Sequence, residues 1–380
     1  MVRIPASLRR ARAEPLGVSR GGLRPDGPAQ RSLPLDPSTV SHIDSPGKVT
    51  LADKVGFLRC PASYTPAPAR VTAIETHLAW VFLAGKFAFK LKKPVRQDVL
   101  DYHTRAARRR ACLAEVRLNR RLAAHVYLGV TPLVRTTGGR LSLDGSGTPV
   151  DWLVRMRRLN ARDMLDRRIE AGFVGPEELG PAADLLARFY RSASPVPTTP
   201  SDVIDRLRRT IETTREDMMS PLYGLPEGIV SRLADRQLAF LDERPALLRA
   251  RSRDGRIVEG HGDLKPEHFY LGSPPAVIDC LEFSRQLRVL DPAEDLSLLS
   301  VECERLGHPE VAAFFFARYS EQTGDRPPPD LLAFYRSVRA LIRAKLSAGH
   351  LRDEPVRNPR RWRARTLRYL WLSLHSLPTR

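Results

Sequence analysis

The stretch from His261 to Phe283 constrains this chain more than any other part of its sequence. It places Asp263 in a loop directly after His-Gly and ahead of the apolar run Phe269–Leu271. Asp279 follows a second apolar run, Ala276–Ile278, where a β-strand would deliver a side chain to its carboxyl end. Phosphoryl transfer uses such a pair, since one carboxylate accepts a proton from the substrate hydroxyl and another holds the Mg²⁺ that bridges the nucleotide phosphates. The segment therefore predicts a short hairpin flanked by two catalytic carboxylates.

This segment resembles the catalytic and metal-binding loops of the aminoglycoside phosphotransferase family, a branch of the protein-kinase-like fold. The family's catalytic loop reads His-Gly-Asp, as here at Asp263, and its metal aspartate is trailed by an acidic residue, as Glu282 trails Asp279. Its Asp-Pro-Ala-x-Asp-Leu signature appears over Asp291–Leu296. The resemblance implies an α+β, two-lobed kinase-like fold, with Asp263 as catalytic base, Asp279 as metal ligand, and ATP and Mg²⁺ as cofactors. Asp295 is expected to cap backbone near the catalytic loop.

Three β-strands are predicted in the amino-terminal half, over Val71–Thr76, Leu78–Ala84 and Phe87–Leu91, because these segments are rich in Val, Ile, Trp and Phe. Gly85–Lys86, between the last two, is typical of a two-residue hairpin turn. In the third strand Lys90 alternates with the phenylalanines, so its side chain is expected on the opposite face.

The resemblance implies that Lys90 contacts the α- and β-phosphates of the nucleotide and that Glu115 is its partner. Glu115 lies 25 residues further on, in a segment whose apolar residues recur at helical spacing. Without the rest of the pattern, Lys90 also fits a solvated edge strand and Glu115 an ordinary surface helix pair. No glycine-rich phosphate loop is present, so phosphate contacts are expected from backbone N–H groups and from Thr76. Pro149–Leu159 is predicted to be the strand that crosses to the large lobe, with its backbone near Met156 holding the adenine ring.

The residue five positions after the catalytic aspartate departs from the family pattern. Kinases and most phosphotransferases have an asparagine there that binds a second Mg²⁺, whereas this chain has His268. Imidazole suits softer divalent metals, and Mg²⁺ favours oxygen ligands. His268 therefore braces the aspartate loop, ligates a different metal, marks a site with one metal, or marks a degenerate enzyme. Lys265 either approaches the transferred phosphate or is solvated, Glu282 either assists the metal or faces water, and His261 is expected to brace the loop.

These residues predict an ATP-dependent phosphotransferase that acts on a hydroxyl group of a small molecule. The alternative is a pseudokinase, a nucleotide-binding or scaffold module without phosphoryl transfer, and His268 keeps that alternative open. A protein kinase is disfavoured because no Asp-Phe-Gly and Ala-Pro-Glu pair brackets an activation segment. The acceptor is left open, since a fold of this kind serves many substrates.

Two longer strings, THLAWVFLAGKFAFKLKKPV and EVRLNRRLAAHVYLGVTPL, are similar to an uncharacterised bacterial subgroup of the family. Some members of that subgroup carry an appended P-loop ATPase domain. This sequence has no G-x-x-x-x-G-K-[ST] motif, so that second domain is expected to be absent.

Four segments are expected along the chain. The first is rich in Arg, Pro and Gly without apolar periodicity, which is typical of disorder. Helical periodicity is clearest over Ser201–Met218 and Asp330–Leu351. The predicted segments are a disordered basic tail at 1–46, a kinase-like small lobe at 47–158, a large lobe with the catalytic loops at 159–351, and an Arg-rich helix at 352–380.

Composition narrows the class of protein. The formal net charge is +19, but the excess lies at both ends, and residues 200–335, with the proposed catalytic loops, are net acidic. The basic segments show no pattern of alternating aromatic and basic residues of the kind that stacks on RNA bases, so specific nucleic-acid binding is not expected. No apolar run of 18 residues could span a membrane. The four cysteines show no metal or redox spacing, which favours reduced thiols in a cytoplasm.

Overall fold

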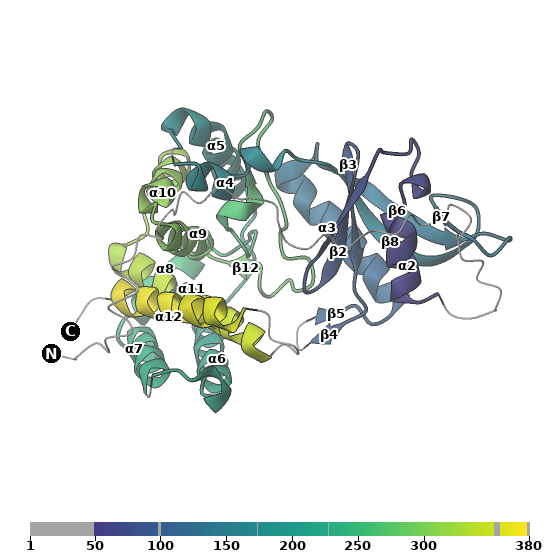
Figure 1. Ribbon diagram of the computed structural model, residues 1–380. Helices are drawn as coiled ribbons and strands as arrows, with labels where there is room; N and C mark the ends of the chain where they lie inside the picture. The colour runs from purple at the N-terminus through teal and green to yellow at the C-terminus, as the bar shows by residue number, and fades with distance from the viewer. Residues whose placement is uncertain (1–48, 98–99, 173, 227, 353–357, 378–380) are drawn as a thin grey trace.

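A computed structural model describes residues 49–97, 100–172, 174–226, 228–352 and 358–377, so the predicted tail at 1–46 lies outside the described part of the chain. Figure 1 shows a β-rich small lobe beside a larger helical lobe. This arrangement confirms the predicted α+β, two-lobed kinase-like fold.

The small lobe is built on a six-stranded sheet in the order β1-β2-β3-β8-β6-β7, with every neighbouring pair antiparallel. The three strands predicted from the sequence are confirmed, each within one residue at either end. Gly85, in the predicted hairpin turn, has φ of +58°, which glycine adopts without steric cost. The strands of this sheet are β1 (Val71–Glu75), β2 (Ala79–Ala84), β3 (Phe87–Lys92), β6 (Tyr127–Arg135), β7 (Leu141–Leu143) and β8 (Thr148–Arg157).

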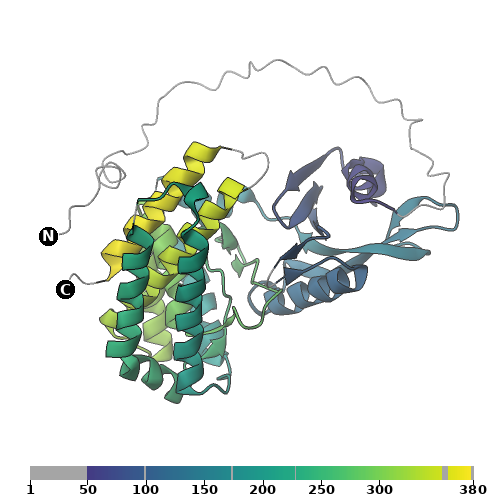
Figure 2. The ribbon, with the colours of Figure 1, turned by 90° about the horizontal axis from the view of Figure 1, so that it is seen from below.

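Two helices cover opposite faces of this sheet (Figure 2). Helix α2 (Leu51–Arg59) packs on the face that carries Phe89, and α3 (Arg105–Ala123) packs on the other face. Because side chains alternate along a strand, Lys90 lies on the face covered by α3. Between β3 and α3 the chain forms a small hairpin, β4 (Arg96–Gln97) with β5 (Leu100–Asp101).

The large lobe is mostly helical, and its core joins helices that are distant in the sequence. Leu186 of α5 (Pro176–Ser192), Leu299 of α9 (Pro292–Leu306) and Phe315 of α10 (Pro309–Thr323) are each at most 2% exposed and belong to one apolar cluster. Phe269, fully buried in the same cluster, anchors the catalytic hairpin to these helices. The helices are α4 (Leu165–Glu170), α5 (Pro176–Ser192), α6 (Pro200–Met218), α7 (Ile229–Glu243), α8 (Pro245–Arg253), α9 (Pro292–Leu306), α10 (Pro309–Thr323), α11 (Pro329–Gly349) and α12 (Pro359–Ser376).

Two short hairpins carry the residues singled out in the sequence. Strand β10 (Phe269–Tyr270) pairs antiparallel with β11 (Ala276–Val277), which confirms the predicted hairpin. Strand β9 (Val258–Glu259) pairs with β12 (Val289–Leu290) and leads directly into the His-Gly-Asp loop. A single 3₁₀ turn, η4 (Pro266–His268), connects that loop to β10. The remaining 3₁₀ turns are η1 (Pro61–Ser63), η2 (Ala161–Asp163), η3 (Pro221–Tyr223) and η5 (His350–Arg352).

The long helices predicted in the large lobe are also confirmed. Helix α6 starts one residue before the predicted Ser201, because Thr199 caps it and Pro200 occupies its first turn. Helix α11 begins at Pro329 and ends at Gly349, two residues short of the prediction. Helix α12 lies along α11, and Tyr369 and Leu370 fill the space between them (Figure 1). The boundaries predicted between the four segments stay predictions.

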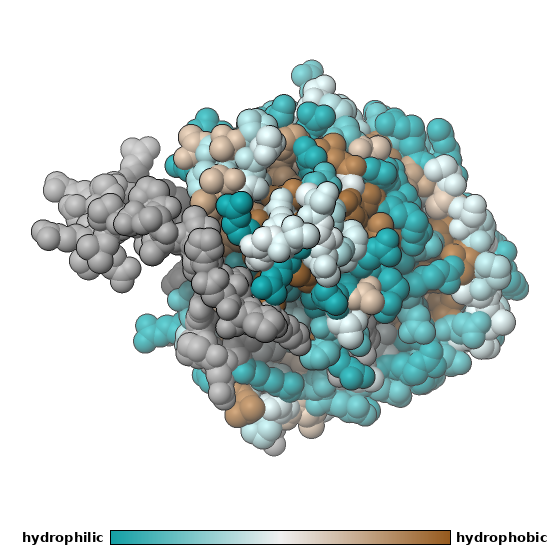
Figure 3. All heavy atoms as spheres, turned by 90° about the vertical axis from the view of Figure 1, so that its right-hand side faces the viewer, coloured by the Kyte–Doolittle hydropathy of each residue, from teal (hydrophilic) through white to brown (hydrophobic). Residues whose placement is uncertain are grey.

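Polar side chains cover most of the small-lobe end of the molecule, with apolar side chains gathered in patches between them (Figure 3). In the part of the chain that the structure describes, no helix has the length and apolar character needed to cross a membrane. All four cysteines are free thiols, and burial raises the pKa of Cys112 and of Cys280 to about 12.

Candidate active site

Lys90 is the centre of a charged cluster between the lobes. Its Nζ lies 2.9 Å from Glu115 Oε1 on α3 and 2.7 Å from Asp279 Oδ1 beyond β11. The Glu115 side chain is fully buried, Lys90 is 18% exposed, and Asp279 is 45% exposed. The structure therefore brings together three residues that are 25 and 189 positions apart in the sequence, as the resemblance implied.

The cluster keeps its members charged. Burial would lower the pKa of Lys90, but the carboxylates of Asp279 and Glu115 more than offset this, and its pKa lies well above the ordinary value. Enclosure would raise the pKa of Asp279, yet the Lys90 ammonium holds it well below the ordinary range. Asp279 is therefore an anion at neutral pH, paired with Lys90 and still partly open to solvent.

A second lysine completes the cluster, and sequence reasoning missed it. Lys92, 1% exposed, lies 2.6 Å from Glu115 Oε2 and also pairs with Glu282. Tyr102 donates its hydroxyl to the same Glu282 oxygen, and the Lys92 ammonium lies 4.9 Å from the centre of the Tyr102 ring. Glu282 thus does not simply face water, because it is buried against Lys92. The signal for Lys92 was the strand alternation that places it on the same face as Lys90.

The backbone at Asp279 aims its carboxylate toward this cluster. Its φ is +61°, a left-handed conformation that aspartate tolerates better than most residues. Its backbone N–H donates to the buried hydroxyl of Tyr127 at 3.1 Å, and the next N–H, of Cys280, donates to Asn119 Oδ1 at 2.9 Å. Since Asn119 lies one turn beyond Glu115 on α3, one helix positions both Glu115 and the Asp279 backbone.

The His-Gly-Asp loop is held by buried hydrogen bonds. Asp295, near the start of α9, accepts the backbone N–H groups of His261 at 2.8 Å and Gly262 at 3.0 Å, which agrees with its predicted capping role. The His261 Nε2–H donates to the Ile278 carbonyl at 2.9 Å, and its Nδ1 accepts the N–H of Asp263 at 3.3 Å. Burial lowers the pKa of His261 to about 3, so this ring is neutral and joins the loop to β11.

Asp263 and His268 face the cluster from the large lobe. The Asp263 carboxylate lies 2.9 Å from Lys265 Nζ; burial would raise its pKa, but Lys265 holds the pKa below the ordinary value. His268 Nδ1–H donates to the Asp263 carbonyl at 2.8 Å, and its Nε2 lies 3.6 Å from Asp279 Oδ2. His268 therefore braces the loop, as one of the sequence hypotheses held, and at the same time stands between the two aspartates.

Comparison with known proteins places this geometry in a known fold. The sequence matches no family model. It is 36% identical over 275 residues to uncharacterized proteins of Mycobacterium tuberculosis and Mycobacterium bovis, covering 72% of this chain and 53% of theirs. The chain thus spans about half the length of the curated relatives it matches.

Among solved structures, the GDP and kanamycin complex of the aminoglycoside phosphotransferase APH(2")-IIIa is similar, with a TM-score of 0.50 and 16% identity over 81% of this chain and 94% of that one. The chain has the aminoglycoside phosphotransferase fold. A choline/ethanolamine kinase family protein from Mesorhizobium loti also aligns, with a TM-score of 0.47, 16% identity, and coverage of 84% and 99%.

Two further predicted contacts of this phosphotransferase fold lie in the small lobe. The Thr76 hydroxyl is engaged in its own turn, donating to the Ala79 carbonyl at 2.9 Å and accepting the Ala79 N–H at 3.0 Å. Met156 lies on β8, paired with Ala88 of β3 and Tyr127 of β6, near the end of the strand that runs toward the large lobe. The structure places Met156 beside the lobe junction, while Thr76 lies in the β1–β2 turn.

The donor groups of this phosphotransferase fold suit a metal that takes most of its ligands from a nucleotide. Within the described residues, no group of three or more His, Cys, Asp and Glu side chains could hold a metal ion by itself. Mg²⁺ commonly takes one or two protein carboxylates and completes its shell with substrate phosphates and water. The Asp279 carboxylate, 45% exposed, fits that mode of binding, and His268 Nε2, 3.6 Å from Asp279 Oδ2, adds a nitrogen atom beside it.

Proposed function

We propose that this chain transfers the γ-phosphoryl group of ATP to a hydroxyl group of a small molecule. The observation that carries the proposal is the position of Lys90, within 2.9 Å of both Glu115 and Asp279, with Asp263 on the opposite lobe. Protein-kinase-like enzymes need a lysine held by a helix glutamate and a metal aspartate in place together.

Asp263 is the proposed catalytic base. It would orient the acceptor hydroxyl and take up its proton as the oxygen attacks the γ-phosphorus. Lys265, 2.9 Å from the Asp263 carboxylate, would balance that charge and lie close to the transferred phosphoryl group. The backbone N–H groups of His261 and Gly262 donate to Asp295, and these hydrogen bonds hold the loop that carries Asp263.

Lys90 is the proposed ligand of the nucleotide α- and β-phosphates, with Glu115 as its support. In this structure the Lys90 ammonium is paired with the Asp279 carboxylate. On nucleotide binding, Lys90 would exchange this carboxylate for phosphate oxygens. Glu115 would keep Lys90 in place during that exchange because Lys92 holds the other Glu115 oxygen at 2.6 Å. Lys92 thus serves as a fixed anchor and Lys90 as the exchanging group.

The exchange frees Asp279, which with His268 would hold a divalent cation. The chemistry supplied by bound Mg²⁺ is neutralisation of charge on the nucleotide phosphates. The Nδ1–H of His268 donates to the Asp263 carbonyl, which leaves Nε2, 3.6 Å from Asp279 Oδ2, as the ring atom that would approach the cation. The β8 backbone near Met156 would hold the adenine ring, and Thr76 would reach a phosphate only by giving up its turn hydrogen bond.

A pseudokinase is the second candidate. Two observations favour it. His268 replaces the usual asparagine, and the Asp279 carboxylate proposed to bind the metal forms an ion pair with Lys90 at 2.7 Å. A pseudokinase would bind nucleotide through Lys90 and the β8 backbone without transferring phosphate.

Nucleotide consumption against a panel of hydroxylated metabolites and aminoglycosides separates the two candidates. The panel includes kanamycin, and each acceptor is tested with ATP and with GTP, because the similar phosphotransferase structure is a complex with GDP and kanamycin. We expect Mg²⁺-dependent turnover with at least one acceptor, loss of turnover in Asp263→Asn, and no change in Asp254→Asn, an exposed aspartate. Nucleotide binding without turnover for every acceptor, with Mg²⁺ or Mn²⁺, would support the pseudokinase.

A further inference from the structure

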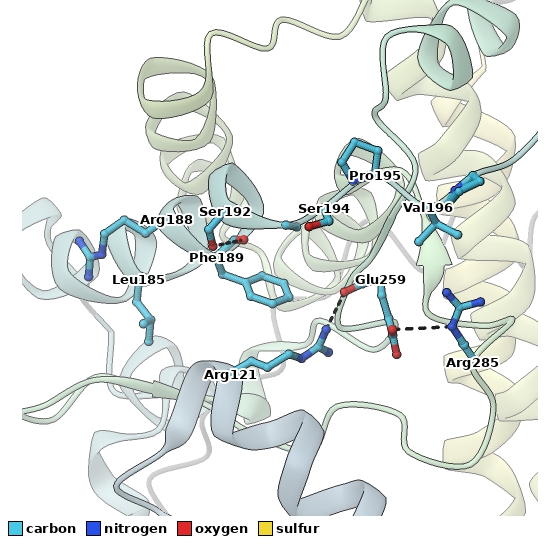
Figure 4. Close-up of a pocket in the computed structure, with 12 residues that line it drawn as sticks. Arg121, Leu185, Arg188, Phe189, Ser192, Ser194, Pro195, Val196, Glu259 and Arg285 are labelled. Atoms are coloured by element: carbon cyan, nitrogen blue, oxygen red, sulfur yellow. Dashed lines mark hydrogen bonds and ion pairs between the residues drawn. The ribbon is translucent and has the colours of Figure 1, made fainter.

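A cavity of about 600 Å³ lies where the end of α3 meets the end of α5 (Figure 4). This volume is within the range of small-molecule sites, roughly 300–1,000 Å³. None of the residues given a role in the proposed phosphoryl transfer lines this cavity. Its lining comes from the last turns of α3 and α5, the loop that follows α5, Glu259 of β9, and Arg285.

The lining carries an excess of positive charge. Three arginines and one glutamate border the cavity. The glutamate, Glu259, is already neutralised from outside the cavity by Arg288, which is 3% exposed and lies 2.8 Å from Glu259 Oε1. Because Glu259 is shared with Arg288, the lining that Arg121, Arg188 and Arg285 provide keeps a net positive charge.

Two of these guanidinium groups have N–H donors that are available to a ligand. The Arg188 side chain is exposed and makes no hydrogen bond or ion pair with any residue in the described part of the chain. Arg285 is 62% exposed, and its Nε lies 3.7 Å from Glu259 Oε2, too long for a hydrogen bond. Guanidinium groups bind carboxylates and phosphates with paired N–H donors, so both are suited to an anion.

The cavity also has an apolar wall. Phe189 and Leu185 of α5 face it together with the loop residues Pro195, Val196 and Pro197 (Figure 4). The Phe189 ring is covered on one side by the Arg121 guanidinium, whose centre lies 5.0 Å from the ring. A ligand with a flat apolar body would find a surface here that a bare inorganic anion would not use.

The back wall of the cavity is joined to the catalytic loop. Arg121 donates to the carbonyl oxygens of Glu259 at 2.7 Å and Gly260 at 2.9 Å, directly ahead of His261. It also approaches Cys280 Sγ at 3.3 Å, next to Asp279. A ligand that contacts Arg121 therefore touches a residue that ties α3 to both loops of the proposed active site.

We propose that this cavity binds a small amphipathic anion, a carboxylate or phosphate monoester attached to a flat apolar group. Arg188 and Arg285 hold the anionic group, and Phe189 with the proline-containing loop holds the apolar body. The contact with Arg121 makes the cavity a place where such a ligand can influence the loops that carry Asp263 and Asp279.

Calorimetric titration tests this proposal with four probes of similar size: phenyl phosphate, benzoate, benzyl alcohol and benzylamine. We expect phenyl phosphate or benzoate, or both, to bind, and the neutral and cationic probes to bind at least about tenfold more weakly. The titrations with the two anions show which anionic group the cavity prefers. Titrations repeated in Lys90→Met report any binding at the proposed nucleotide site, so a failure of the proposed kinase function does not affect this test.

The decisive variant is the double change Arg188→Gln and Arg285→Gln, which removes both charges and keeps polar side chains. Loss of two charge-assisted contacts is expected to weaken anion binding about tenfold or more. The matched control is Arg191→Gln, another exposed arginine of α5 that does not line the cavity. Unchanged anion affinity in the double variant, equal binding of benzylamine, or no binding of any probe would overturn the proposal.

Discussion

Lys90 and Lys92 share one carboxylate: Glu115 contacts Lys90 through Oε1 at 2.9 Å and Lys92 through Oε2 at 2.6 Å. The two lysines differ in what else they touch. Lys90 reaches Asp279, which is partly open to solvent, whereas Lys92 reaches Glu282 in the protein interior. One lysine is therefore available to a ligand, and the other is fully committed to the protein.

This difference predicts opposite profiles for two methionine variants. Lys92→Met leaves Glu115 and Glu282 without their buried partner, and we expect it to lower the free energy of unfolding by roughly 3–5 kcal/mol. Lys90→Met removes a more exposed lysine while Lys92 still holds Glu115, so we expect a smaller loss of stability and a loss of nucleotide turnover. Urea denaturation measures the free energy of unfolding of each variant, and a nucleotide turnover assay measures its activity. Equal destabilisation by the two changes would contradict the division of roles.

Asp279→Asn is expected to abolish Mg²⁺-dependent turnover while leaving the fold intact. The amide loses the charge proposed to hold the metal, and asparagine tolerates the φ of +61° found here. Asp144→Asn is a matched control, because Asp144 also has a positive φ, of 55°, and is an exposed residue directly after β7. Retained turnover with unchanged metal dependence in the Asp279 variant would remove this residue from the proposed metal site.

His268 distinguishes a working enzyme from a pseudokinase. We expect His268→Asn to keep or raise Mg²⁺-supported turnover, because an amide oxygen suits Mg²⁺ better than imidazole nitrogen. His268→Ala is expected to lower turnover, since it removes the 2.8 Å hydrogen bond to the Asp263 carbonyl. The same variants assayed in Mn²⁺ separate a ligand role from a bracing role. Turnover that is unchanged in both variants would show that His268 takes no part in the reaction.

Glu302 provides a pH-dependent contribution to stability that is independent of catalysis. It is fully buried on α9, 2.6 Å from Arg343 Nε and 2.8 Å from Arg305 Nε, and it accepts the Tyr369 hydroxyl at 2.6 Å. Burial would raise its pKa, but Arg343 and Arg305 lower it from 4.5 to about 2. A depressed carboxyl pKa stabilises the folded state above the unfolded pKa, and this contribution is lost as the pH falls from about 4.5 toward 2.

Glu302→Gln should therefore cost roughly 3 kcal/mol at pH 7, and the difference from wild type should shrink as the pH falls below about 4.5. Urea midpoints measured at pH 7 and at pH 3.5 give the comparison. Glu321→Gln, in an exposed pair with Arg318, serves as a control with little expected effect at either pH. A difference that stays constant over this range would show that the charge of Glu302 contributes nothing to stability.

The sequence by itself determined the local parts of this protein. Period-two alternation in the third strand placed Lys90 opposite the phenylalanines, and helical spacing placed Glu115 on a helix. The apolar runs around Asp279 predicted the hairpin that β10 and β11 form. Such patterns depend on neighbours within a few residues, so they are readable without knowledge of the rest of the chain.

Only the tertiary structure decided which distant groups meet. The strand pattern placed Lys92 beside Lys90, but its partner Glu282 lies 190 residues away. Nothing local in the sequence indicates that Arg121 donates to the backbone carbonyl of Glu259, 138 residues on. Nor does it indicate that the Thr76 hydroxyl donates to the Ala79 carbonyl within its own turn. A charged side chain is buried only where folding brings a compensating group to it, and that compensation depends on how the two lobes and their helices pack.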